Sequence, residues 1–168
     1  MKPQVINRTL ILGMIVGLTM PLAHLLSQTA TKHPVQTHGV YLPSEMQWQE
    51  GPPTLPPGAK MVMLEGDMTK AGPFTMRLRV PDGYHIPPHT HPGVEHLTII
   101  SGTLKIVMGD RLERSAAQTL PAGSFAIMPA GMKHAAWVEG ETIIQGHGLG
   151  PWGINYLKPE DDPRNAKK

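Results

Sequence analysis

Three histidines and one glutamate stand within eight positions of the chain, in the stretch HTHPGVEH at residues 89–96. Groups of this kind are costly to bury unless each finds a partner. Together with His134 they offer nitrogen and oxygen donors, which suit a divalent ion such as Fe, Mn, Ni, Cu or Zn. The chain has no cysteine, which excludes disulfides and thiolate metal sites. The stretch therefore predicts a metal centre with nitrogen and oxygen ligands; the alternative is a set of ordinary loop histidines.

The spacing within this stretch predicts that its three histidines are not equivalent. His89 and His91 are two residues apart, so on an extended segment their side chains point to the same face. After the turn predicted at Pro92–Gly93, Glu95 and His96 occupy opposite faces of the next strand. We therefore expect Glu95 to join the first two histidines, and His96 to stay outside the ligand set.

The segments that must position these side chains are predicted to be β-strands. GPFTMRLRV, residues 72–80, alternates apolar with polar residues, as a half-buried strand does. Residues 94–100 and 103–108 predict two strands joined as a hairpin at Ser101–Gly102. SFAIM, HAAWVEG and ETIIQGH continue the series between Gly and Pro turn signals. Many short strands with no helix before the tail are typical of an antiparallel sandwich or barrel.

The two ends of the chain differ from this region. Residues 1–30 carry Lys2 and Arg8, then an apolar run, then small and polar residues, which is the order of a secretory signal. We expect a periplasmic or secreted protein, attached to a membrane only if this segment stays uncleaved as an anchor. Residues 31–59 predict an irregular arm, because five prolines between 43 and 57 oppose a regular helix or a central strand. Residues 60–157 form the predicted barrel, and 158–168 a charged, mobile tail.

Charge excludes one class of partner. Lys2 and Arg8 are the only charged residues of the first thirty, so residues 31–168 carry 13 basic and 13 acidic side chains. Such a near-neutral domain has no basic stripe to neutralise phosphates, and we expect no nucleic-acid partner. Homodimers are expected, because small barrels of this kind expose sheet edges that pairing protects.

Two longer spacings resemble those of a known family. In GYHIPPHTHPGVEHLTIISG, residues 83–102, the first Gly, the HTH triplet, the Glu and the last Gly match the first cupin motif. In GSFAIMPAGMKH, residues 123–134, the Gly, the PAG triplet and the His match the second motif, whose last position is usually Asn and here is Val138. The chain thus resembles a small single-domain cupin of the secreted bacterial type over about residues 60–150.

This resemblance implies a fold and a ligand set. The fold would be all-β, an antiparallel jelly-roll (cupin) β-barrel preceded by the irregular proline-rich arm. The metal ligands would be His89, His91, Glu95 and His134. The Asn of the family motif is not a ligand, so Val138 is expected to leave the metal in place and to change only the pocket wall.

The inward face of the predicted barrel supplies an apolar pocket beside the metal, formed by Met76, Leu97, Ile99, Phe125, Ile127 and Val138. Such a pocket suits a small, partly apolar molecule, phenolic or diketone-like; for most of the six the alternative is plain barrel core. His147 is a possible acid–base group at the barrel mouth, or else a solvated loop histidine. Trp152 and Tyr156 are expected to pack the barrel end.

The ligand set points to an enzyme. Four protein ligands on an octahedral ion leave about two positions for substrate and dioxygen, as in a non-heme metal dioxygenase. Glu95 would then act as ligand and as catalytic proton acceptor. A fold does not fix a reaction, so a non-enzymatic metal- or ligand-binding sensor and a cupin isomerase, decarboxylase or lyase remain alternatives.

Overall fold

The computed structural model describes residues 39–166. The secretory signal predicted at 1–30 and the beginning of the predicted arm lie outside these residues. Across the described range, no helical segment combines the length and the hydropathy of a membrane span.

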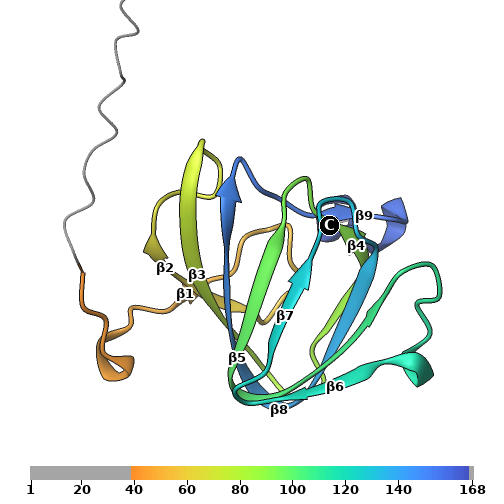
Figure 1. Cartoon of the computed structure of the whole chain (residues 1–168), viewed down its shortest axis with the longest axis horizontal. Coiled ribbons are helices and arrows are strands. Elements are labelled where there is room, and N and C mark those ends of the chain that lie inside the picture. The colour runs from red at the N-terminus through yellow and green to blue at the C-terminus, as the bar shows by residue number, and fades with distance from the viewer. Residues whose placement is uncertain (1–38, 167–168) are drawn as a thin grey trace, which may run out of the picture. The chain divides into compact units, whose positions relative to one another are not determined.

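One curled antiparallel sheet holds all the strands of the described part of the chain (Figure 1). Its strands are β1 Gln49–Glu50, β2 Lys60–Glu65, β3 Gly72–Val80, β4 His85–Thr90, β5 Glu95–Met108, β6 Gln118–Pro121, β7 Phe125–Met128, β8 His134–Gly150 and β9 Asn155–Tyr156. The order is β1-β2-β3-β8-β4-β9, and β5 pairs with β8, β7 and β6. Within residues 39–166 the helical pieces are short 3-10 turns, η1 Pro43–Glu45, η2 Arg114–Ala116, η3 Pro159–Asp161 and η4 Pro163–Asn165. The predicted all-β antiparallel barrel is confirmed.

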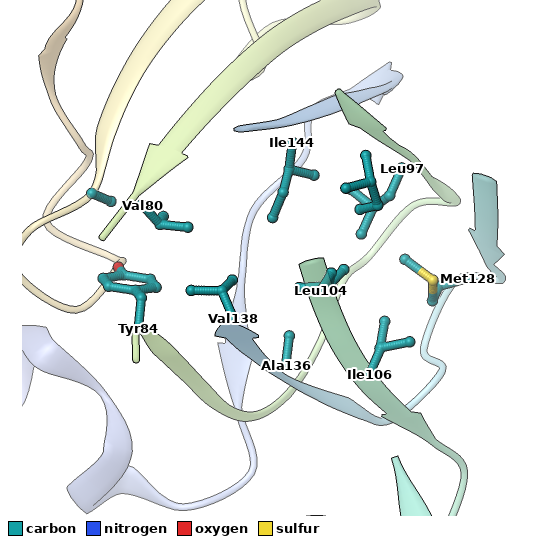
Figure 2. Close-up of a cluster of buried hydrophobic side chains, with 11 residues drawn as sticks. Val80, Tyr84, Leu97, Leu104, Ile106, Met128, Ala136, Val138 and Ile144 are labelled. Carbon is teal, nitrogen blue, oxygen red and sulfur yellow. The ribbon is translucent and has the colours of Figure 1, made fainter. Parts of the chain in front are cut away.

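The core fills the inside of the curled sheet (Figure 2). Buried residues alternate with less buried ones along most of β5 and β8, as the two-residue period of a strand requires, and Val107 and Ala135 are buried in addition. These strands contribute most of the cluster, with β3 and β7 adding one residue each, and its labelled members are Val80, Tyr84, Leu97, Leu104, Ile106, Met128, Ala136, Val138 and Ile144. The long, bent strands therefore supply both the core and the frame of the site.

The hairpin predicted at Ser101–Gly102 is wrong, because β5 runs unbroken from Glu95 to Met108. The two strands predicted at 134–140 and 141–147 are likewise one strand, β8. The register between β5 and β8 shifts on both sides of Ser101, so each strand bends there and continues. Gly102 and Gly140 therefore lie at bends within continuous strands, where turns between separate strands were expected.

Gly102 makes this bend possible. Its φ is +76°, and a Cβ there would lie 2.4 Å from Thr142 Oγ1 and 2.6 Å from the Glu141 carbonyl oxygen. The Thr142 hydroxyl is buried at the bend, where it accepts a hydrogen bond from the Thr103 backbone N–H at 3.2 Å. Gly140, at the opposite bend, has φ +72° but open space where a Cβ would stand.

We expect Gly102→Ala to destabilise the fold more than Gly140→Ala. Both substitutions place an L side chain in a left-handed conformation, which costs about 1–2 kcal/mol, but only the one at position 102 also drives a methyl group into Thr142 and the β8 backbone. Urea unfolding of the two variants measures the difference. Equal losses of unfolding free energy would show that the close approach at the bend is not what fixes Gly102.

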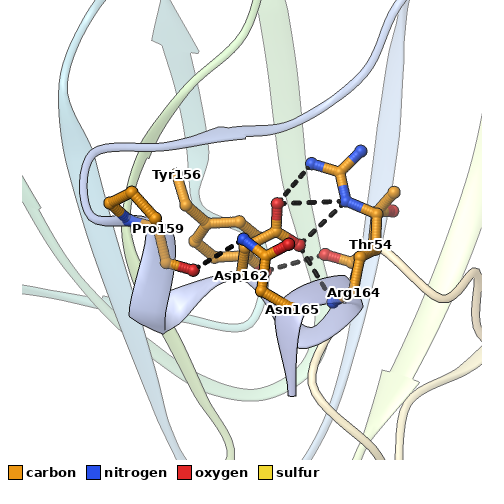
Figure 3. Close-up of polar contacts among 6 residues, drawn as sticks. All are labelled: Thr54, Tyr156, Pro159, Asp162, Arg164 and Asn165. Atoms are coloured by element: carbon orange, nitrogen blue, oxygen red, sulfur yellow. Dashed lines mark hydrogen bonds and ion pairs between the residues drawn. The ribbon is translucent and has the colours of Figure 1, made fainter. Parts of the chain in front are cut away.

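The arm and the C-terminal residues are attached to the barrel. The Tyr84 hydroxyl donates to the Pro56 carbonyl at 2.5 Å, and the Tyr156 hydroxyl donates to the Thr54 carbonyl at 2.8 Å. Next to Tyr156, the Asp162 carboxylate accepts from the backbone N–H and the guanidinium of Arg164 (Figure 3). Residues 159–165, where the sequence predicts a mobile tail, thus form two hydrogen-bonded 3-10 turns. The hydrogen bonds from Tyr84 and Tyr156 hold the arm at one end of the barrel.

Candidate metal centre

Three strands meet at the candidate site. His89 lies in β4 and His91 directly follows that strand, whereas Glu95 begins β5 and His134 begins β8. His89 pairs with His134 across the β4–β8 ladder. The register of this ladder shifts between Ile86 and His89, where the two intervening prolines have no N–H to donate. The strand ends thereby bring the four side chains to one point inside the barrel.

The four side chains are buried and in contact. One nitrogen from each of His89, His91 and His134 falls within 4.8 Å of the others, as the ligands of a single ion must. Glu95 Oε2 lies 3.3 Å from Nε2 of His91 and 3.3 Å from Nε2 of His134. The structure thus brings together the four residues that the cupin resemblance proposes as ligands.

Backbone carbonyls orient all three imidazoles. Nδ1 of His89 lies 2.7 Å from the Pro87 carbonyl oxygen. A carbonyl can only accept, so Nδ1 must carry the proton and Nε2 keeps its lone pair. The same contact is made by His91 to the Gly153 carbonyl at 2.7 Å and by His134 to the Met132 carbonyl at 3.0 Å. Metal-binding histidines are commonly held in this way.

The polar atoms of the cluster are those a cation would satisfy. Glu95 Oε2 and His91 Nε2 are buried and have no hydrogen-bond partner in the structure. With Nδ1 protonated, Nε2 of His91 and Nε2 of His134 each direct a lone pair at Glu95 Oε2 across 3.3 Å, which is favourable only with a cation between these atoms. Burial lowers the pKa of His89 to about 3, and the other two imidazoles add to this effect. A metal ion would take up the Nε2 lone pairs together with an ionised carboxylate, so these residues fit a divalent transition ion.

His96 and His147 lie on the outer face of the sheet. They pair across β5 and β8, with ring centroids 4.8 Å apart and planes 7° from parallel. For His96 this is the position that the strand alternation predicts. Of the two alternatives for His147, the acid–base position at the barrel mouth is contradicted, because the neighbouring Gly146 takes the inward position opposite Met76. His147 lies in strand β8, where a loop was expected.

A cavity of ≈ 200 Å³ adjoins the cluster, and we call it the mouth cavity. His89, His91 and Glu95 form its inner wall. The other walls come from the arm, β2, β3, β4 and the loops at 66–71 and 151–154, through Pro52, Thr54, Leu55, Met61, Met68, Thr69, Met76, Leu78, Ile86, Trp152, Gly153 and Ile154. A ligand in this cavity would therefore lie directly against the candidate metal ligands.

The predicted pocket is corrected at several positions. Met76 lines the mouth cavity, and Leu97 lines a smaller cavity of ≈ 40 Å³ on the inner side of the cluster. Ile99 and Val138 lie in the buried hydrophobic core and do not line a cavity wall, which agrees with the alternative that they are core residues. The prediction that Phe125 and Ile127 line the pocket is wrong, because these residues are 52% and 53% exposed on the outer face of β7. The inward residues of β7 are its other two, since Met128 pairs with Glu95 and is buried.

Trp152 is the main residue of the site that the sequence did not reveal. It was expected only to pack the barrel end, and it does contact Phe74 at 5.4 Å between ring centroids. Its indole also stacks on the His91 imidazole, with centroids 4.0 Å apart and planes at 15°. Its backbone N–H donates to the Met68 carbonyl at 2.7 Å, which joins the two loops of the cavity wall. The contact with His91 comes from a segment more than fifty residues away, so local spacing carries no signal of it.

A family comparison accords with this geometry. The profile of the ChrR Cupin-like domain matches residues 36–152, which include most of the predicted arm and all four candidate ligands. The chain belongs to this family. No protein with a curated function matches it.

Solved structures share the fold at low sequence identity. A candidate acetylacetone dioxygenase from Methylibium petroleiphilum aligns at a TM-score of 0.58 and 19% identity, over 76% of this chain and 87% of that one. The DMSP lyase DddQ from Ruegeria pomeroyi aligns at 0.56 and 19%, over 70% and 64%. An RmlC-like cupin from Shewanella frigidimarina aligns at 0.53 and 13%, over 67% and 91%. These likenesses show the cupin fold; the activities belong to the proteins named.

Replacing His91 should reduce metal content, whereas replacing His96 should not. His91→Gln removes one of three converging imidazoles, while His96→Gln changes a side chain on the other face of the same sheet. Elemental analysis after dialysis should find about one ion per chain in the wild type and in His96→Gln, and much less in His91→Gln. A similar loss in both variants would contradict the ligand set.

Proposed function

We propose that this cupin is a metal-dependent enzyme of the oxygenase type that acts on a small, partly apolar molecule, phenolic or diketone-like. The observation that carries the proposal is the shared wall: three candidate metal ligands, His89, His91 and Glu95, also line a cavity whose other walls are mostly apolar. A ligand that chelates the metal through oxygen would place its remaining atoms in that cavity.

The metal and the protein would have separate tasks. A bound iron or copper ion would supply Lewis-acid and redox chemistry at the site. His89, His91 and His134 would hold that ion through Nε2, while the apolar walls would exclude water from the bound substrate. Trp152 would keep the His91 ring in place from the cavity side.

Glu95 would contribute its negative charge. A glutamate is ionised at neutral pH, which favours the role of Glu95 as the fourth ligand and lowers the net charge of the site. As the only carboxylate that lines the mouth cavity in the described part of the chain, it is also the candidate to accept a proton from a bound enol or phenol.

Two structural neighbours support the reaction class by analogy, and a third supports an alternative. Besides the candidate acetylacetone dioxygenase, a salicylate 1,2-dioxygenase mutant from Pseudoaminobacter salicylatoxidans, in complex with gentisate, shares the fold at a TM-score of 0.50 and 15% identity. The DMSP lyase favours the lyase alternative on the same grounds. The choice between them rests on whether the chain consumes dioxygen.

Two predictions from the sequence complete the proposal. Export to the periplasm or the exterior would follow from residues 1–30, and the protein would then acquire its metal outside the cytoplasm. Homodimers would follow from the need to protect sheet edges.

Glu95→Gln should lower activity more than it lowers metal content. Glutamine has nearly the same size but carries no negative charge and accepts no proton, while three imidazoles remain to hold the ion. We expect oxygen uptake with a diketone or phenol to fall by ~100-fold or more, with most of the metal retained by elemental analysis. Wild-type protein that holds its metal and consumes no oxygen with any such compound would contradict the oxygenase proposal and favour the sensor or lyase.

A further inference from the structure

The mouth cavity contains one carboxylate and no cationic side chain. Among its described lining residues none is lysine or arginine, and the histidines that line it are the candidate metal ligands. Lys70, on the loop that contributes Met68 and Thr69, is exposed and pairs with Asp67 at 2.9 Å. The wall therefore has no positive group to receive a second anion.

Apart from the candidate ligands, the unpaired polar atom of the wall among the described residues is the buried indole Nε1 of Trp152, a neutral donor. Thr69 donates to the Asp67 carboxylate from both its hydroxyl, at 2.7 Å, and its backbone N–H, at 2.9 Å. The Thr54 carbonyl accepts from Tyr156. Met61, Met68 and Met76 present thioether chains, which are apolar and adapt their shape to a ligand.

The charges of the site limit what can bind. A divalent ion with neutral imidazoles and one carboxylate leaves one net positive charge in a buried place. A single anionic chelating group neutralises that charge. A second anionic group would find at most the neutral Trp152 N–H and no cation among largely apolar side chains, so the lost hydration of the ion would not be compensated.

We infer that the mouth cavity selects ligands with one oxygen-chelating group and an uncharged, apolar remainder, and rejects those that carry an additional carboxylate. This inference rests on the proposed function of the same site and narrows its substrate class. Selection would come from the methionine and aliphatic walls, and one added cation at Met61 or Met68 would weaken it.

A matched pair of β-diketones tests the selection. Heptane-2,4-dione and 4,6-dioxoheptanoate have the same seven-carbon chain and the same chelating group, and they differ only in the terminal carboxylate. Titration calorimetry on zinc-loaded protein measures binding without turnover, because zinc has no redox chemistry. We expect the carboxylate to bind roughly 100-fold more weakly than the neutral dione. Elemental analysis after each titration checks that the diketone has not removed the zinc.

Three lysine variants test whether the lack of a cation in the cavity wall causes this selection. Met68→Lys and Met61→Lys each add a cation to the wall from a different element, on an unbranched side chain like that of methionine. Either should improve the relative affinity for the carboxylate by at least ~10-fold. Ile127→Lys adds the same charge on the outer face and should leave the ratio nearly unchanged. Circular dichroism and retained binding of the neutral dione identify the variants that fold.

Each remaining outcome contradicts a defined part of the account. Equal binding of the two diketones to the wild type would overturn the selection while leaving the oxygenase proposal to the oxygen-uptake assay. Folded Met68→Lys and Met61→Lys proteins that keep the wild-type ratio would show that the apolar wall is not its cause. A zinc-loaded wild type that binds neither diketone would overturn both the selection and the diketone branch of the proposed function.

Discussion

The site depends on the backbone carbonyl oxygens that hold the three imidazoles at Nδ1. Because a carbonyl only accepts, each contact fixes the tautomer of its histidine and leaves Nε2 free. Two of the carbonyls lie two residues before their histidines, but the third, at Gly153, belongs to the segment that also carries Trp152. The ligand set and the cavity wall are thus built by the same chain segments.

The barrel positions these carbonyls through its bends. Gly102 and Gly140 let β5 and β8 continue around the fold, so that one end of β8 supplies His134 and its other half closes against β3. The loop before His134 is fixed in turn, since the Gly131 N–H donates to the His91 carbonyl at 2.9 Å. A change at the bends would therefore reach the site through the strands themselves.

The sequence predicted the parts of this arrangement that depend on local spacing. The two-residue period identified β3 and separated Glu95 from His96, because neighbours on a strand point to opposite faces. The same period failed for β7, because all four of its residues are apolar and either alternate pair could face inward. The pairing of Met128 with Glu95 decides that Met128 and Ala126 face inward. Bends were also mistaken for hairpins, since a glycine with positive φ serves either purpose.

The cavity walls were beyond prediction for a different reason. They combine residues from the arm, from the 66–71 loop and from 151–154, and no periodic pattern links segments so far apart. Trp152 illustrates this: an aromatic residue near the end of a barrel is consistent with packing alone. Only the fold shows that it stacks on His91 and faces the cavity.

The central claim is that His89, His91, Glu95 and His134 hold one metal ion. Anomalous diffraction from crystals of the metal-loaded protein tests it most directly. The account predicts one strong peak inside the barrel, about 2.0–2.2 Å from the three Nε2 atoms and from a Glu95 carboxylate oxygen. A strong peak on the outer face, at His96 and His147, with none among these four residues would contradict it.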